Sequence, residues 1–274
     1  MLPKRELLKS QWQLWLLAVS FFSRIPVKMC TDISASMLNE ASRYFALVGV
    51  LIGAVSALAF YLCATVMPLE MALLIAMASS VLLTGAFHED GWADVWDGFG
   101  GGWTVENKLS IMKDSRLGTY GATALFFILM IKYQALLALI YHDLGAIASV
   151  NQALNLLAVL VLGHCLSRVL ATSLIADMPY VSEDASSKVK PLAQALSKQS
   201  YLILLATGTV VLLFTLSFSL AWQLVVILLL TRWCIKRWFT KQLGGYTGDC
   251  LGAAQQLSEV VIYIALLSLS SVGL

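Results

Sequence analysis

The chain has 274 residues, of which 59% are hydrophobic and only 12% are charged, and its formal net charge is +2. A soluble domain carries about 25% charged residues, so this composition excludes an ordinary soluble enzyme and indicates an integral membrane protein. The small net charge gives no reason to expect a nucleic-acid partner, and we expect a lipid bilayer as the surroundings.

The first predicted element is an N-terminal helix over residues 11–22. This stretch is apolar, but it has no convincing small-residue cleavage site, so it is not typical of a cleavable signal peptide. Arg24, Pro26 and Lys28 follow it directly. We interpret it as an interfacial or re-entrant helix.

Uncharged stretches of about 20 residues, the length that a bilayer helix needs, predict the membrane spans. They cover residues 44–69, 71–87, 117–142 with Lys132 inside, and 144–167. Residues 199–231 would form a helix of about 50 Å, longer than the hydrocarbon core of about 30 Å, so we split them near residues 217–219. A weaker span over residues 253–274 completes the set. The prediction is an all-α, polytopic integral membrane bundle of about seven transmembrane helices, forming a single membrane-embedded domain over residues 1–274.

In this arrangement Lys and Arg gather on one side of the membrane, apart from Lys132 and Arg168 within spans. The opposite loops, at residues 67–70, 142–145 and 217–219, hold no Lys or Arg. Because positive residues favour the cytoplasmic side, we expect a bacterial-type inner membrane with the N-terminus inside. The chemistry is then expected on the cytoplasmic face. The loops predicted there are residues 88–119, 177–198 and 236–252.

A cluster of acids lies in the first of these loops, in the stretch HEDGWADVWDGFGGGW at residues 88–103. The spacing of Asp90, Asp94 and Asp97 is i, i+4, i+7, which on a helix places three carboxylates on one face. Like charges there repel, and a hard divalent cation, Mg²⁺ or Mn²⁺, would compensate them. The alternative is a solvated loop face. The glycines Gly100, Gly101 and Gly102 would let backbone N–H groups approach phosphate oxygens.

Two further stretches carry candidate residues. In IMKDSRLGTYGA, residues 111–122, Lys113 and Arg116 bracket Asp114, a set suited to binding a diphosphate or completing a metal shell; ordinary positive flanking of a span is the alternative. In LGGYTGDCLGAAQQLSE, residues 243–259, Asp249 could join the first cluster, although the residues alone favour a helix cap by Thr247 or Asp249.

Charged and titratable residues also occur within the spans. Arg168 lies at the inside end of its span, where either a paired, functional charge or a snorkelling side chain is expected. Lys132 is deeper and is interpreted as lining the bundle or snorkelling. His164 is interpreted as a buried histidine with a satisfied hydrogen bond.

Together these stretches resemble the cobalamin synthases, also called adenosylcobinamide-GDP ribazoletransferases. TGAFHEDGWADVWDGFGGGW, IMKDSRLGTYGA, SRVL and LGGYTGDCLGA follow one another in the order of that family, over essentially the whole chain. The resemblance implies a Mg²⁺-dependent inner-membrane transferase. It would join adenosylcobinamide-GDP to α-ribazole or its 5′-phosphate and release GMP.

This chemistry assigns roles to the candidate residues, since phosphoryl transfer needs positioning and charge neutralisation around a diphosphate. Asp90 and Asp94 are the leading Mg²⁺ ligands, and Asp97 is a ligand or the general base. Asp249 is a further ligand. Lys113, Arg116 and Arg168 neutralise the diphosphate.

The chain departs from the family pattern at two places. Glu89 stands where an apolar residue is common, and residues 178–184 read MPYVSED, where an arginine often follows Pro-Tyr. One alternative is a CDP-alcohol phosphotransferase, although the Ala-Arg of that motif is absent because Asp94 follows Ala93. The other is a membrane transporter, which would carry charged or unwound sites near the middle of the bilayer. A homo-oligomer is left open.

Overall fold

The computed structural model describes residues 4–28, 33–143, 150–181 and 195–271. Its regular elements are helices, apart from one isolated β-bridge between Tyr180 and Tyr246. In chain order the elements are α1 Lys4–Phe22, α2 Ala35–Ala41, the 3₁₀ helix η1 Ser42–Tyr44, α3 Phe45–Ala64, α4 Leu69–Thr84, α5 Phe87–Gly101, α6 Val105–Met112, α7 Thr119–Asp143, α8 Val150–Ser173, the 3₁₀ helix η2 Leu174–Ala176, α9 Lys198–Thr215, α10 Phe218–Leu243 and α11 Gly248–Ser271.

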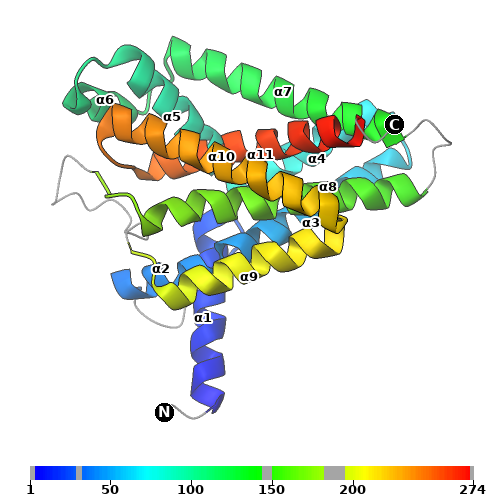
Figure 1. Cartoon of the computed structure of the whole chain (residues 1–274), viewed down its shortest axis with the longest axis horizontal. Helices are drawn as coiled ribbons and strands as arrows, with labels where there is room; N and C mark the ends of the chain where they lie inside the picture. The colour runs from blue at the N-terminus through cyan, green and yellow to red at the C-terminus, as the bar shows by residue number, and fades with distance from the viewer. Residues whose placement is uncertain (1–3, 29–32, 144–149, 182–194, 272–274) are drawn as a thin grey trace.

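The helical membrane bundle predicted from the sequence is confirmed. Six helices of the described residues are long and apolar enough to cross a membrane, and counting the bent pair α4–α5 as one span gives up to seven. The predicted break near residues 217–219 is also confirmed, because α9 ends at Thr215 and α10 begins at Phe218. The predicted N-terminal helix is α1, which lies across the long helices of the bundle (Figure 1).

The second predicted span, residues 71–87, begins and ends earlier than expected. Helix α4 ends at Thr84 and is followed by Gly85, whose φ of +66° is the left-handed conformation that glycine adopts without a steric penalty. Ala86 follows with a φ of +58°, and α5 then leaves α4 at an angle of 85°. The chain therefore turns sharply immediately before the acidic stretch.

Two of the expected loops are largely helical. Residues 88–119 form most of α5 and all of α6, and residues 236–252 belong mostly to α10 and α11, with a short connection at residues 244–247 between them. Much of the third, residues 177–198, lies outside the described residues. Local polar patterns suggested loops there, but packing against the bundle stabilises helices: α5 packs against α7 and α11.

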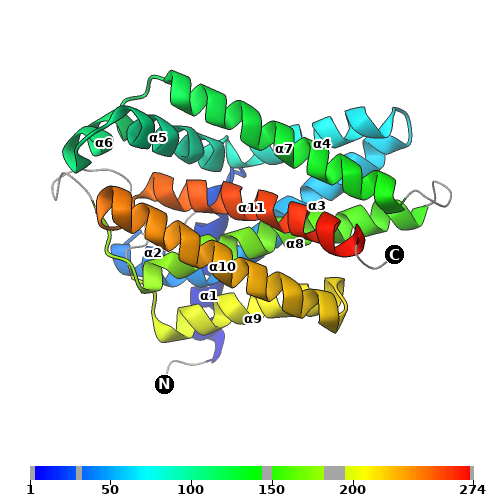
Figure 2. The same ribbon diagram turned by 45° about the horizontal axis from the view of Figure 1, so that its top comes forward.

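The bundle brings distant segments together at one end. In Figures 1 and 2, α5, α6, the end of α10 and the start of α11 lie at the same end of the long helices, beside the start of α7. The central helices α8 and α11 are the most enclosed, since 78% and 72% of their apolar windows are buried. In contrast, α9 and α10 are mostly exposed, at 22% and 17% buried, as expected of helices that face lipid.

Candidate active site

The acidic helix α5 and the start of α11 touch at Gly91. A Cβ atom added at Gly91 would lie 2.8 Å from the carbonyl oxygen of Asp249 and 3.0 Å from its Cα, so the two backbones meet where only glycine fits. Asp249 is 158 positions further along the sequence than Gly91 (249 − 91). This crossing is what brings the two glycine and acid motifs together.

Asp94 is the centre of the resulting acidic cluster, which consists of Asp90, Asp94 and Asp249. Asp94 is partly buried, and its carboxylate is repelled by those of Asp249, Asp90 and Asp97. The prediction that Asp249 joins the first cluster in space is therefore supported. The helix cap is provided by Thr247, whose hydroxyl oxygen accepts a hydrogen bond from the Cys250 N–H at 3.2 Å.

Asp97 stabilises the start of the next helix. Its two carboxylate oxygens accept hydrogen bonds from the backbone N–H groups of Gly118, at 2.7 Å, and Gly121, at 2.8 Å. Gly118 directly precedes α7 and Gly121 lies in its first turn, where N–H groups have no partner within the helix and a negative charge is favourable. Asp97 is 8% exposed, so the structure shows a side chain that holds α7 against α5. Its predicted role as ligand or general base stays a prediction.

The glycine run packs helices together. Gly100 and Gly101 end α5, and the Gly102 N–H donates to the Gly98 carbonyl at 2.9 Å. A Cβ atom at Gly100 would lie 2.6 Å from the Tyr120 ring, and one at Gly102 would lie 2.8 Å from the Lys108 backbone. The close approach that the sequence suggested is present, but protein groups occupy it. Binding of phosphate oxygens there stays a prediction.

Two of the three residues in the second stretch pair with each other. Arg116 donates to Asp114 through its Nε at 3.0 Å, through a second guanidinium nitrogen at 2.5 Å and through its backbone N–H at 3.0 Å. The side-chain bonds first, and then the backbone bond, lower the pKa of Asp114 to about 2. Arg116 is 86% exposed, so its guanidinium remains accessible.

Tyr180 lies within electrostatic range of both Lys113 and Asp249. Burial raises the pKa of the Tyr180 hydroxyl, the negative charge of Asp249 raises it further, and the positive charge of Lys113 lowers it. Tyr180 is held there because the neighbouring Val181 N–H donates to the Tyr246 carbonyl and the Tyr246 N–H donates to the Pro179 carbonyl. Direct contact of Lys113 with a diphosphate stays a prediction.

A second group of charges lies in the middle of the bundle. The Lys132 ammonium contacts the Glu259 carboxylate at 2.6 Å, and Glu259 also accepts hydrogen bonds from Tyr263 at 2.9 Å and Gln255 at 2.6 Å. His164 Nδ1 lies 3.4 Å from the same carboxylate. Glu259 is fully buried, and the group joins α7, α8 and α11. We name it the Glu259 network.

The sequence patterns interpret Lys132 and His164 individually and assign no role to Glu259. A signal was present, because Lys132 and Glu259 are isolated opposite charges in two otherwise apolar spans, and charges at membrane depth usually pair.

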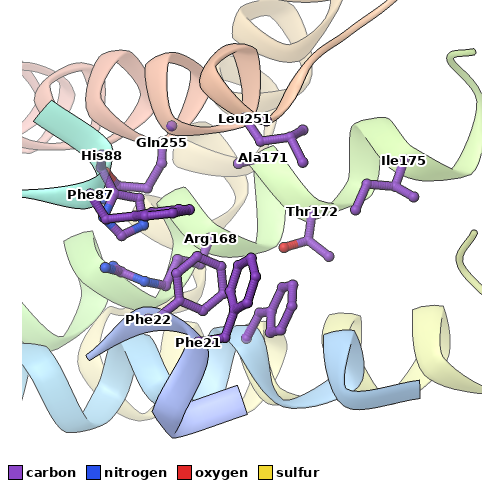
Figure 3. A pocket seen from close by; sticks show the side chains of 13 residues that line it. Phe21, Phe22, Phe87, His88, Arg168, Ala171, Thr172, Ile175, Leu251 and Gln255 are labelled. Atoms are coloured by element: carbon purple, nitrogen blue, oxygen red, sulfur yellow. The ribbon is translucent and has the colours of Figure 1, made fainter. Parts of the chain in front are cut away.

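Arg168 belongs to the core near this network. It is 2% exposed, donates to the His164 carbonyl at 2.9 Å, and has its guanidinium carbon 5.9 Å from the centroid of the Phe22 ring. Figure 3 shows Arg168 with Phe22, Phe87 and His88 around a cavity of about 20 Å³. That space is about enough for one water molecule. Because Arg168 is buried, the snorkelling interpretation is wrong, and its guanidinium bonds to His164 instead. A functional role in contact with a diphosphate stays a prediction.

The acids do not form a ready-made metal cage. Within the described ranges, no group of three or more His, Cys, Asp or Glu side chains is arranged to hold a metal ion. Asp90, Asp94 and Asp249 are nevertheless hard oxygen donors at one place. Mg²⁺ characteristically uses one or two carboxylates together with water and substrate phosphates, so this set fits Mg²⁺ better than an ion that needs an all-protein cage.

The architecture and site together define a multi-pass helical membrane protein whose carboxylates and cations converge at one end of the bundle. The family model described as cobalamin-5-phosphate synthase matches residues 14–267, and the chain belongs to that family. No solved structure matches the chain.

Curated relatives extend over nearly the whole chain. The adenosylcobinamide-GDP ribazoletransferase of Shewanella frigidimarina is 50% identical over 94% of this chain and 95% of its own. The protein of the same name from Shewanella piezotolerans is 51% identical over 94% and 96%. The one from Vibrio parahaemolyticus is 47% identical over 97% and 96%. The resemblance stated from the sequence motifs is confirmed.

Proposed function

We propose that the chain is an adenosylcobinamide-GDP ribazoletransferase, which joins adenosylcobinamide-GDP to α-ribazole or its 5′-phosphate and releases GMP in cobalamin biosynthesis. The single observation that carries the proposal is the convergence of Asp90 and Asp94 with Asp249 across the Gly91 crossing. Family membership and the names of relatives that align over at least 94% of the chain support it.

The reaction forms one phosphorus–oxygen bond and breaks another. The ribazole 3′-hydroxyl oxygen attacks the phosphorus that carries cobinamide, and the bond from that phosphorus to the bridging oxygen of GMP breaks. The hydroxyl proton passes to a carboxylate, and GMP leaves with the bridging oxygen. We assign the proton to Asp94, because both oxygens of Asp97 already accept backbone hydrogen bonds and Asp94 is central to the acidic cluster.

We propose Mg²⁺ as the cofactor, held by Asp90 and Asp249, which leaves the Asp94 carboxylate to accept the proton. When bound, the ion would neutralise the diphosphate and the acidic cluster. Lys113 and Arg116 would pair with diphosphate oxygens from the side of the loop. A phosphate would have to compete with Asp114 for Arg116, since these two side chains are already paired.

We further propose that this end of the bundle faces the cytoplasm of a bacterial inner membrane. The one-sided distribution of Lys and Arg supports this orientation. The matching relatives that we describe come from bacteria.

One observation bears on the transporter alternative. A transporter is expected to carry charged groups near the middle of the bilayer, and the Glu259 network lies near the middle of α11. The carboxylate of this network is fully buried and bonded to neighbouring side chains, and the cavity beside Arg168 is only about 20 Å³. We therefore assign the network to the stability of the bundle.

The test uses the purified full-length protein in lipid vesicles with adenosylcobinamide-GDP, α-ribazole and Mg²⁺, with GMP release as the readout. We expect turnover that stops when EDTA removes the metal and returns when Mg²⁺ is added. Asp90→Asn should lower turnover by at least about a hundredfold without preventing membrane insertion. Glu106→Gln, which removes an exposed acid on the neighbouring helix α6, is the matched control and should retain turnover.

Other outcomes would reject the proposal. Release of CMP from a CDP-alcohol, with no GMP from adenosylcobinamide-GDP, would favour the CDP-alcohol phosphotransferase. Movement of substrate across the vesicle membrane without GMP release would favour a transporter. Normal turnover of Asp90→Asn would remove Asp90 from the site.

A further inference from the structure

The end of α10 carries a basic recess that the proposed reaction does not use. It is a shallow space open to the surroundings, and all of its lining side chains come from this one helix: Trp233, Lys236, Arg237, Trp238, Thr240 and Lys241, which we name the α10 recess. The Arg237 guanidinium lies over the Trp233 ring, 4.9 Å from its centroid. None of these lining side chains is acidic.

The charge of the recess is only partly balanced by its neighbours. Lys236 pairs with Asp177 at 2.7 Å, and Arg232, one turn earlier on α10, pairs with the same carboxylate at 2.6 Å. One acid thus balances one of these two cations. Arg237 and Lys241 add two further positive charges on the exposed surface.

An apolar groove leads to this recess along α10. It is about 220 Å³ in volume and lies between α8, α9 and α10. Arg232 is one of the residues that line it, and its apolar side chains include Leu166, Leu170, Leu205, Leu212, Val225 and Leu228. We name it the α8–α10 groove. Val225, Leu229, Arg232 and Lys236 have the spacing i, i+4, i+7, i+11, so they follow one stripe of the helix from the groove to the recess.

Both features lie on the lipid-facing side of the bundle. Leu229, Leu230 and Trp233 are 61%, 59% and 55% exposed, in a helix that is apolar enough to cross the membrane. The uncharged part of α10 ends at Thr231, and the basic residues of the helix begin at Arg232. Because Lys and Arg gather where a helix leaves the hydrocarbon, we place the recess at the level of the lipid headgroups.

We propose that this surface binds an anionic phospholipid, with its phosphate in the α10 recess and one acyl chain in the α8–α10 groove. Clustered Lys and Arg beside a membrane helix recognise anionic headgroups, and the adjoining apolar groove suits a hydrocarbon chain. The bound lipid would also contact the catalytic helix indirectly. Trp238 of the recess has its ring centroid 5.8 Å from that of Trp96 and 5.3 Å from that of Phe99, both on α5.

The test measures lipids that remain bound to the full-length protein by native mass spectrometry after release from nanodiscs of equal phosphatidylglycerol and phosphatidylcholine. We expect phosphatidylglycerol to be retained preferentially. Arg237→Gln/Lys241→Gln removes two charges without breaking the Asp177 pairs, and should lower this preference about thirtyfold, at about fivefold for each charge. The control Lys28→Gln/Lys198→Gln removes two exposed charges elsewhere and should change it by less than about threefold.

A second variant tests the groove without changing charge. Thr209 lines the groove, and Thr209→Phe should weaken binding of long-chain phosphatidylglycerol while leaving a short-chain form unaffected. Three results would overturn the proposal: equal retention of the two lipids by the unaltered protein, an equal loss in the control variant, or loss of both chain lengths with Thr209→Phe. A raised KM for adenosylcobinamide-GDP with Arg237→Gln/Lys241→Gln in pure phosphatidylcholine would instead assign the recess to substrate.

Discussion

Replacing Asp97 by Asn tests whether this residue positions helices or takes part in chemistry. The aspartate makes two charge-assisted hydrogen bonds to backbone N–H groups, at 2.7 and 2.8 Å, in a site where it is 8% exposed. Hydrogen bonds to charged groups contribute about 1.5–3 kcal/mol each. Asn keeps one acceptor oxygen and places an NH₂ group opposite the other N–H, so we expect a loss of about 2–4 kcal/mol in stability.

The assay compares melting temperatures and GMP release for Asp97→Asn and Asp94→Asn in the same lipid. At about 2–4 °C per kcal/mol, Asp97→Asn should lower the melting temperature by about 4–16 °C, with turnover reduced but measurable below the transition. Asp94→Asn removes a repelled charge, so it should leave the melting temperature unchanged or raise it, and abolish turnover. An unchanged melting temperature together with complete loss of turnover in Asp97→Asn would refute the positioning role.

Two further substitutions test the packing described above. Gly91→Ala places a Cβ atom 2.8 Å from the Asp249 carbonyl oxygen, so it should separate α5 from α11, lower the stability by about 1–3 kcal/mol and lower turnover. The control in a thermal melt is Gly101→Ala, whose Cβ atom would meet its nearest neighbour at 3.4 Å. Equal melting temperatures of the two variants would contradict the crossing. Lys132→Met leaves Glu259 without its cation and should lower the stability by about 3–5 kcal/mol. Lys132→Met/Glu259→Gln should recover part of that stability in the same measurement. If the stability losses of the two single variants simply add in the double variant, the two residues are not coupled.

The acidic cluster could be predicted from the sequence to a useful extent. The spacing of Asp90, Asp94 and Asp97 does place three carboxylates along one side of a helix, and Asp249 does join them. The spacing predicts which face of the helix these residues share, but it does not predict which of them other helices bury. Asp90 is exposed, whereas Asp97 is buried because the start of α7 covers the end of α5.

Other features depend on contacts between distant residues or on unusual backbone. Lys132 and Glu259 are 127 positions apart (259 − 132), and only the packing of α7 against α11 shows that they are partners. The sharp turn before α5 depends on Ala86 at a φ of +58°, a conformation that alanine rarely adopts. Nothing in the apolar sequence indicates a turn there, and the predicted span, residues 71–87, therefore includes Ala86. The expected loops became helices for a similar reason, since their stability comes from tertiary packing.

The pairing of Lys132 with Glu259 also has a consequence for how the protein is made. Helix α7 leaves the ribosome before α8, α9, α10 and α11. The Lys132 ammonium on α7 therefore has no carboxylate partner until α11, which carries Glu259, has been synthesised. A lone lysine at that depth is costly in hydrocarbon. Helix α7 is therefore expected to settle fully into the membrane only when α11 arrives, which makes the end of translation the step that completes assembly.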